Sequence, residues 1–364
     1  MSARVTVVGS IGGPGYGLVD PVGGLTAAGA DWSIGWCVGA DDGWHAPAVG
    51  RQRLESPGVV ETRLKVPSGD AVQRVYGVGG AGDIVVVEIV NDSPLPFGVG
   101  FLLRGDPSIL WPREPFPLDE PLGACDAAVQ LPVAHRTSTR IAVALDPHAV
   151  DPGATVARLA TAEDVARGWR AVLDAGMRVD LPDGSLMVAL DVARSCLLLH
   201  DDGVAIAVEP GERAADPVAA ATMVVAMERW GFNRHAAELR PAIPRRAFKR
   251  VGRPDPTLAM RPAPGDALSA AEFLLRARDM VISEVEGGVA VLPVMPEAWR
   301  GGPIEVHDAP VGDARVSYAI RWHDDRPALL WTVEGGPLRL SAPGLDRAWS
   351  TTEPSGETLL AAAT

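Results

Sequence analysis

Lysine is nearly absent from this chain of 364 residues: Lys65 and Lys249 are the two lysines, and arginine supplies the other 31 of 33 basic residues. Acidic residues number 46, so the formal net charge is −13 and the pI is about 5.0. Proteins that follow a phosphate backbone need an excess of Lys and Arg on their surface. We therefore expect no nucleic-acid partner.

Long hydrophobic runs are also missing. No stretch approaches the roughly 18 consecutive apolar residues of a membrane-spanning helix. The first residues, Met1–Val8, show no basic segment followed by an apolar run and a small-residue cleavage site. We therefore expect neither a membrane span nor a secretion signal, and we predict a cytoplasmic location.

Cysteine and histidine are few and scattered. Cys37, Cys125 and Cys196 are odd in number and far apart, which argues against a disulfide framework. The seven histidines form no pair at i, i+4 spacing and have no cysteine neighbour at the spacing of a zinc site. The sequence therefore predicts no metal and no cofactor.

Aromatic residues make up only 5% of the chain, yet ten of these nineteen are Trp. Tryptophan stacks on sugar rings and also fills hydrophobic cores. Trp32, Trp36 and Trp44 cluster in the sequence, and an unbroken strand would place Trp32 and Trp36 on one face. These three are our candidate residues for binding a carbohydrate, with core packing as the alternative role.

Glycine and proline, with 40 and 32 residues, favour many turns and short strands. Up to about residue 160, short Val-rich or alternating segments are bounded by Gly, Pro, Asp or Asn, which is typical of an antiparallel sandwich. These segments are Arg4–Val8, Val59–Val66, Gln73–Val78, Ile84–Val90 and Arg140–Leu145. The proline-rich stretch Asp106–Gly123 is expected to form a loop or a sheet edge.

A strand followed by glycines, Val5–Gly17, is similar to a dinucleotide-binding fingerprint. Such a site needs a helix directly after the glycines, because the helix N-terminus holds the pyrophosphate. The residues that follow do not favour a helix, so a glycine-rich hairpin or loop is predicted instead.

The pattern becomes helical at Thr161. A capping-box-like Thr161–Asp164, the pair Asp216 and Pro217, and the capping box Ser269–Glu272 mark helix starts. A basic, proline-rich connector is expected over Arg240–Pro264. The predicted helices run from Thr161 to about Ala175, over Ser185–His200, from Pro217 to Trp230, from Asn233 to about Arg240, and from Ser269 to about Ile282; Ser185–His200 is apolar on nearly all sides and should be buried.

From Glu284 the chain returns to strands, and Arg315–Trp322 alternates strictly between a wet and a packed face. The predicted fold is therefore a multidomain combination of α and β. An N-terminal antiparallel β-sandwich covers residues 1–160, a reduced helical domain covers 161–283, and a small C-terminal β domain covers 284–364.

Two stretches carry a resemblance to a known family. One is Pro296–His307 together with Ser317–Trp322 and Pro327–Trp331; the other is Glu209–Gly211 followed by Ala220–Phe232. With the order β, α, β, the chain resembles six-hairpin glycosidase-like proteins of the glucoamylase and glycogen-debranching type, as a truncated actinobacterial relative. The resemblance implies a helical region derived from an α/α-barrel.

The chain departs from this family where the family holds its sugar. The Arg-Asp pair of the family falls at Val218 and Ala219, whose side chains neither donate nor accept hydrogen bonds. The connector Arg240–Pro264 stands where the catalytic acid would be carried, and fewer helices are predicted than the family barrel contains. We therefore predict a glycosidase-like protein that has lost catalysis and serves as a carbohydrate-binding or partner subunit. Its apolar helix faces would be covered by its own β domains or by another chain, as in a homo-oligomer.

Two alternatives stay open. The first is an active glycoside hydrolase or lyase that uses Glu209, Glu212 and Asp216, because these residues match the sugar-facing loop of the family. Glycoside hydrolysis needs two carboxyl groups facing each other across the scissile bond. The second is a structural or regulatory protein without a sugar ligand, which a thermal-shift screen against sugars would distinguish.

Overall fold

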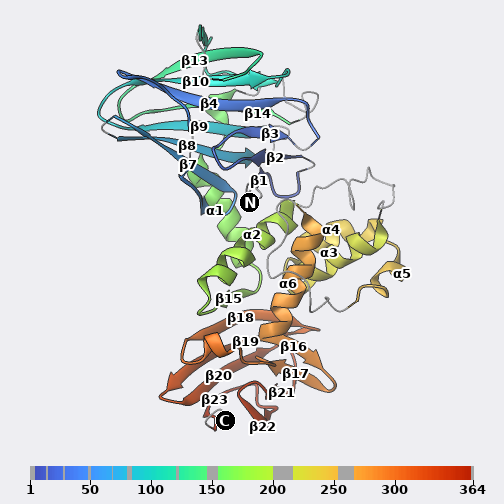
Figure 1. The fold of residues 1–364 in the computed structure, drawn as a ribbon. Helices are drawn as coiled ribbons and strands as arrows, with labels where there is room; N and C mark the ends of the chain where they lie inside the picture. Colours follow the sequence, from blue (N-terminus) through green and yellow to red (C-terminus); the bar gives the residue numbers. More distant parts are fainter. Residues whose placement is uncertain are drawn as a thin grey trace. The chain divides into compact units, whose positions relative to one another are not determined.

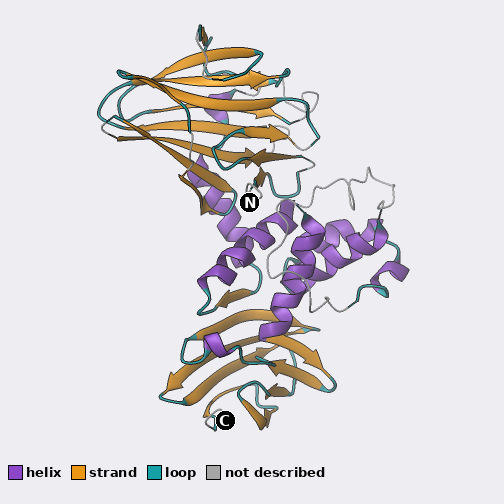
Figure 2. Ribbon diagram, in the orientation of Figure 1, coloured by secondary structure: helices purple, strands orange, loops and turns teal. Residues whose placement is uncertain are grey.

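The computed structural model describes residues 5–13, 15–27, 29–47, 51–67, 69–79, 84–119, 123–145, 155–199, 216–252 and 266–361. The chain divides into two compact units (Figure 1). The first comprises Met1–Arg170 and Leu199–Asp201, and the second comprises Ala171–Leu198 and Asp202–Thr364. Figure 2 shows that both units contain sheets, and most helices belong to the second. The predicted mixture of α and β elements with antiparallel sheets is confirmed.

Two antiparallel sheets make up the first unit. The eight-stranded sheet comprises β1 (Thr6–Gly9), β2 (Tyr16–Val19), β3 (Leu25–Ala27), β4 (Ser33–Ala40), β5 (Gly43–His45), β10 (Phe97–Arg104), β12 (Phe116–Pro117) and β13 (Ala127–Val133). The six-stranded sheet comprises β6 (Arg51–Ser56), β7 (Val59–Val66), β8 (Gly69–Val78), β9 (Ile84–Asp92), β11 (Ile109–Leu110) and β14 (Ser138–Ala144). All five predicted segments contain strands, and the described residues of the proline-rich stretch form the short strands β11 and β12.

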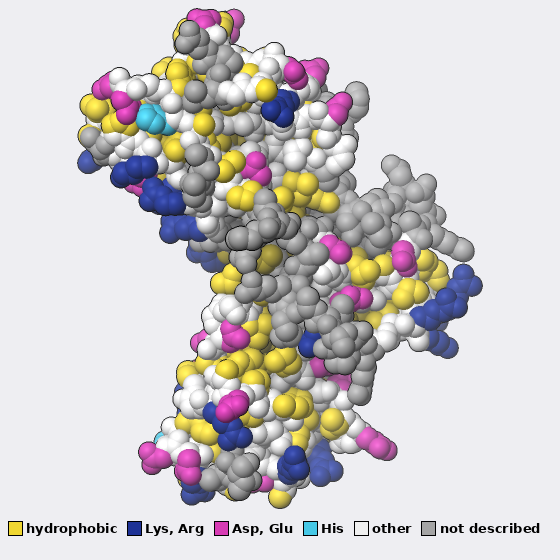
Figure 3. Space-filling model, viewed as in Figure 1, with side chains coloured by type: hydrophobic (Ala, Val, Ile, Leu, Met, Phe, Trp, Pro, Cys, Tyr) yellow, Lys and Arg dark blue, Asp and Glu magenta, His cyan; other side chains and the backbone are white. Residues whose placement is uncertain are grey.

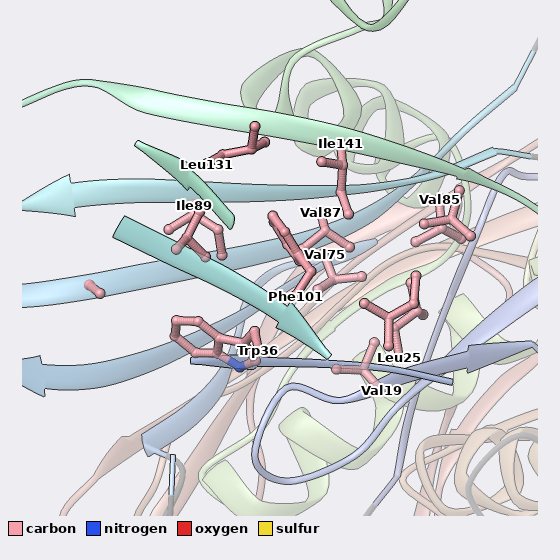
Figure 4. Close-up of a cluster of buried hydrophobic side chains, with 14 of the residues drawn as sticks. Val19, Leu25, Trp36, Val75, Val85, Val87, Ile89, Phe101, Leu131 and Ile141 are labelled. Atoms are coloured by element: carbon pink, nitrogen blue, oxygen red, sulfur yellow. The ribbon is translucent and has the colours of Figure 1, made fainter. Parts of the chain in front are cut away.

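The core of the first unit lies between these sheets. Alternation along a strand sends every second side chain inward, so Trp36 of β4 lies directly opposite Phe101 of β10. Val75 and Val87 of the six-stranded sheet meet Phe101 in the centre of the cluster (Figure 4). Each is at most 3% exposed. Apolar side chains from both sheets therefore hold the two layers together.

The glycine-rich segment near the N-terminus is a hairpin, as predicted. Strands β1 and β2 pair antiparallel from Thr6 opposite Val19 to Gly9 opposite Tyr16. Gly77 of β8 approaches this hairpin so closely that an added Cβ would lie 2.1 Å from the carbonyl carbon of Gly9. The close approach of the two backbones explains the absence of a side chain at Gly77.

A short helical segment covers the outer face of the six-stranded sheet. The 3₁₀ helix η1 (Val156–Arg158) and the start of α1 (Ala162–Asp174) pack on an apolar row that includes Tyr76. The predicted capping box at the start of α1 is present, because the Asp164 N–H donates to Thr161 Oγ1 and the Thr161 N–H donates to the Asp164 carboxylate, both at 3.2 Å.

The remaining described helices belong mainly to the second unit. They are α2 (Gly184–Leu199), α3 (Pro217–Arg229), α4 (Asn233–Leu239), η2 (Arg240–Ala242), α5 (Arg245–Phe248) and α6 (Ala267–Val281). The predicted start of the last helix was wrong: the N-cap is Asp266, three residues before the predicted Ser269, and it accepts from the Ser269 N–H at 3.0 Å. The connector also contains two short helical segments, η2 and α5.

Helix α2 is less completely buried than predicted. Leu190 and Leu197 are at most 1% exposed, but Val188 is 63% exposed. In α3 the apolar face is buried within the single chain; for example, Met223 and Met227 are 0% exposed. No helix among the described residues is both long and apolar enough to cross a membrane. Cover by a second copy of the chain stays a prediction.

Two further sheets complete the second unit. The five-stranded sheet comprises β15 (Arg178–Asp180), β18 (Ile304–Val311), β19 (Ala314–His323), β20 (Arg326–Glu334) and β23 (Ser355–Leu359). The four-stranded sheet comprises β16 (Ile282–Val285), β17 (Gly288–Val291), β21 (Leu340–Ala342) and β22 (Asp346–Thr351), and its β17 and β21 run parallel. The 3₁₀ helix η3 (Glu297–Trp299) lies between β17 and β18 in the chain.

Strand β15 explains why the helices and the C-terminal strands form one compact unit. It lies between α1 and α2 in the sequence, yet it pairs with β18, with Val179 opposite Val306. The helical segment thus contributes an edge strand to the five-stranded sheet. A finer division of this unit into a helical and a β domain stays a prediction.

Candidate functional site

Two of the three candidate tryptophans are buried in the core of the first unit. Trp32 is 9% and Trp36 is 3% exposed, and both belong to the core between the sheets. The Trp36 indole Nε1–H donates to the carbonyl of Val22 at 2.9 Å, so its polar atom is also satisfied. Burial leaves no open ring face on Trp36 for stacking a sugar.

Trp44 lies on the opposite face of the same sheet and keeps part of its surface exposed. Its indole rests on three glycines of β4 and β10: an added Cβ at Gly39, Gly98 or Gly100 would lie 3.0, 3.6 or 3.1 Å from ring atoms of Trp44. Leu118 also packs against Gly100. Among the three tryptophans, Trp44 alone remains available to a ligand.

The candidate carboxylates are only partly within the described residues. Glu209 and Glu212 lie outside them. Asp216 caps α3, because its Oδ1 accepts from the N–H groups of Val218 at 2.9 Å and Ala219 at 3.0 Å. The start of this helix is therefore occupied by its own cap.

A pocket of about 290 Å³ lies among the helices of the second unit. Val225 and Arg229 reach it from successive turns of α3, and Leu275 and Asp279 reach it in the same way from α6. Residues four apart share one face of a helix, so each helix presents one apolar and one charged side chain. The other lining residues are Phe248, Val251, Gly252, Ser283 and Glu284.

Both carboxylates of this pocket face a guanidinium. Arg229 Nη1 lies 3.7 Å from Asp279 Oδ1, across α3 and α6. Arg278 Nη2 lies 3.5 Å from Glu284 Oε1. Glu284 is 46% and Asp279 is 29% exposed at the side chain, so a ligand can reach both. The pocket therefore presents carboxylate acceptors beside a guanidinium donor.

The buried side chain of Arg278 fixes the elements around the pocket. It is 0% exposed and donates to the carbonyls of Arg229 at 3.2 Å, Ile282 at 3.4 Å and Pro310 at 2.6 Å. Burial lowers the pKa of its guanidinium, and the nearby Arg229 acts in the same direction. These bonds join the ends of α3 and α6 to β18, and they place Glu284 at the rim.

The first unit has a more apolar pocket of about 410 Å³ on the outer face of its eight-stranded sheet. Leu18, Gly35 and Leu102 line it together with Asp20 and Arg104. The polar groups are already engaged: Asp20 Oδ1 accepts from the N–H groups of two loop residues, and the Arg104 Nε–H donates to a carbonyl at 3.0 Å. Trp44 does not line this pocket.

Comparison of the chain with known protein families and with curated proteins finds no match. The described residues contain no group of three or more His, Cys, Asp and Glu side chains that could hold a metal ion. The candidate site therefore rests on the pocket between α3, α5, α6 and β16.

Sequence reasoning missed this pocket. Arg229, Asp279 and Glu284 belong to three different elements, α3, α6 and β16. A lone charged residue in the last turn of a helix is typical of a solvated position. The one available signal was the pair of i, i+4 combinations, Val225 with Arg229 and Leu275 with Asp279.

Proposed function

We propose that this protein is a carbohydrate-binding relative of six-hairpin glycosidases that does not hydrolyse its ligand. The observation that carries the proposal is the pocket of about 290 Å³ in which Asp279 and Glu284 accompany Arg229. Sugar hydroxyl groups donate to carboxylates and accept from guanidinium groups, while apolar side chains contact the ring carbons. Val225, Leu275 and Phe248 supply such apolar surface.

The pairing of both carboxylates with arginine favours binding over cleavage. A glycoside hydrolase needs one carboxyl group that donates a proton to the leaving oxygen and a second that assists on the other side. Asp279 and Glu284 instead lie 3.7 and 3.5 Å from guanidinium nitrogens, so each already acts as an acceptor in an ion pair. The order of sheets, helices and sheets along the chain is consistent with the proposed ancestry.

Thermal-shift measurements against glucose, maltose, trehalose and longer α-glucans test the proposal. A sugar that occupies the pocket at about 100 times its Kd stabilises the fold by about 2.7 kcal/mol. The variant Glu284→Gln should lose this shift, because it loses one charged acceptor at the rim. Glu286→Gln removes an equal charge two residues away, outside the pocket, and should keep the shift.

Three outcomes would contradict the proposal. A wild-type protein that shows no shift with any of these sugars does not bind them. Equal shifts for Glu284→Gln and wild type would place the ligand elsewhere. Release of glucose from maltose or an aryl glucoside, abolished by Glu284→Gln or Asp279→Asn, would make the pocket a hydrolytic site.

A further inference from the structure

A second charged surface lies on the first unit, on the outer face of β6, β7 and β8. Figure 3 shows Lys and Arg side chains gathered over the part of this unit that contains these strands. We define the basic face by its five cations, which alternate along the strands and therefore point to one side of the sheet. They are Arg51, Arg53, Arg63, Lys65 and Arg74.

A buried carboxylate organises the centre of the basic face. Glu61 is 0% exposed, and its Oε1 lies 2.8 Å from both Arg53 Nη2 and Arg63 Nε. Its Oε2 lies 3.5 Å from Arg74 Nε. One carboxylate thus positions three guanidinium groups from three adjacent strands, and the hydrogen bond that Arg63 donates to Glu61 raises the pKa of Arg63.

The cations of the basic face outnumber the nearby carboxylates. Asp70 serves three of them at once, at 2.9 Å from Arg51 and 3.7 Å from both Arg63 and Lys65. With Asp92 opposite Asp70 and Glu88 opposite Arg74, five cations meet four carboxylates, an excess of one positive charge in a chain of net charge −13. This local sign is opposite to that of the whole protein.

The strand register places two of these cations opposite each other, and Asp70 partly offsets their repulsion. Arg51 lies directly opposite Arg63 in the pairing of β6 with β7. Like charges directly opposite each other destabilise a sheet. The side chains of Arg51, Arg53 and Lys65 are 57%, 57% and 72% exposed, so their charges remain accessible. These exposed charges are therefore available to an anionic ligand.

We infer that the basic face binds an anionic polysaccharide that carries carboxylate groups along its chain. Adjacent strands are about 4.8 Å apart and alternate residues about 6.7 Å apart, so the guanidinium groups form a grid that suits a linear polyanion. Guanidinium groups bind carboxylates in a planar, bidentate manner. The site is separate from the pocket near Glu284 and does not depend on the proposed function.

Other polyanions fit this surface less well. Single-stranded nucleic acid binds through aromatic side chains on which bases stack, and the basic face as defined contains none. A protein interface has an apolar centre with a polar rim, whereas the centre here is the Glu61 ion-pair cluster. A sugar polymer needs neither feature, because its hydroxyl and carboxylate groups match charged side chains directly.

Calorimetric titration with polygalacturonate tests the inference on the full-length protein at low and at elevated salt. Wild type should bind, and salt should weaken the binding, because the contacts are between exposed charges. The double variant Arg51→Gln with Lys65→Gln should bind at least about tenfold more weakly. Arg158→Gln with Lys249→Gln removes the same charge from two exposed positions elsewhere and should bind as wild type does. Circular dichroism and thermal melting show whether all variants fold.

Four results would overturn the inference. The first is a wild-type protein that does not bind polygalacturonate. The second is an equal loss of affinity in both double variants, which would indicate general charge attraction. Tighter binding of oligodeoxythymidine or polyglutamate than of polygalacturonate would assign the face to a nucleic acid or an acidic protein. Loss of binding in Glu284→Gln would move the polymer to the other unit.

Discussion

In the first unit two antiparallel sheets meet across an apolar core, whereas in the second unit helices end against sheets, and buried polar side chains occupy those junctions. Phe101 in the first core is 0% exposed and contacts apolar neighbours from both layers. At the ends of α3 and α6, by contrast, Arg278, Tyr318 and Trp230 are nearly or fully buried and donate to backbone carbonyls.

The difference follows from what a sheet and a helix leave unpaired. Strands within a sheet satisfy their backbone groups with each other, so the space between two sheets can be filled by apolar side chains alone. A helix leaves its last carbonyls without partners. The Tyr318 hydroxyl donates to the Val281 carbonyl at 2.6 Å, and Arg278 donates to those of Arg229 and Ile282. Polar side chains therefore complete the helix ends in the second unit.

Replacing Arg278 by Met should break the second unit and spare the first. The change leaves the carbonyls of Arg229, Ile282 and Pro310 buried without their donor, which should cost about 3–5 kcal/mol of unfolding free energy. Urea unfolding measures the loss, and hydrogen exchange should show reduced protection in α3 and α6. The control Arg315→Met, at an exposed position of β19, should change stability by less than about 0.5 kcal/mol. Equal protection in the variant and wild type would contradict the role of Arg278.

Replacing Phe101 by Ala should break the first unit by a different mechanism. It removes a fully buried ring and leaves a cavity between the sheets, with an expected cost of about 3–5 kcal/mol. Hydrogen exchange should show the loss of protection in β4 and β10 and not in α3 and α6. Phe116→Ala is the matched control, because Phe116 is 57% exposed and should tolerate the change. Lost protection in both units would show that they unfold together.

Alkaline pH should destabilise the first unit through Tyr76, which lies beneath η1 and α1. Burial raises its pKa to about 12 from an ordinary value of 10.0. The neutral phenol is therefore favoured in the folded state. Its contribution to the free energy of unfolding is complete below about pH 10 and is lost as pH rises toward about 12. Urea unfolding of wild type should weaken over this range more steeply than that of Tyr76→Phe. Parallel slopes would mean that the hydroxyl does not titrate with unfolding.

Much of the first unit could be predicted from the sequence, because alternation and turn residues act locally. The segment Val59–Val66 forms a strand with the predicted bounds, and Asp216 caps its helix as expected. The start of α6 was misplaced because Asp266 and Ser269 are both good caps, and Ala267 and Leu268 readily extend a helix from the earlier one.

The candidate site could not be predicted in the same way. Its charged residues are brought together by the packing of α3 against α6 and by the strand that follows α6. None of these contacts has a local sequence pattern, and Arg278, which fixes them, looks like any other arginine on a helix. The basic face illustrates the same limit, since its charge excess depends on the register of three strands.

Substitutions of Asp216 should have the smallest effect on stability, and they distinguish a helix cap from a catalytic carboxylate. Its Oδ1 accepts from the Val218 and Ala219 N–H groups, so Asp216→Ala should cost about 1 kcal/mol of stability. Asp216→Asn keeps an accepting oxygen and should cost almost nothing, since Asn caps helices as well as Asp does. If Asp216 acts only as a cap, Asp216→Asn should show the same thermal shifts with sugars as wild type. Asp216→Ala should also show these shifts, measured from its own lower melting temperature. If Asp216 were catalytic, Asp216→Asn would keep its stability and lose hydrolytic activity. The isosteric amide preserves the fold but removes the charge on which hydrolysis depends.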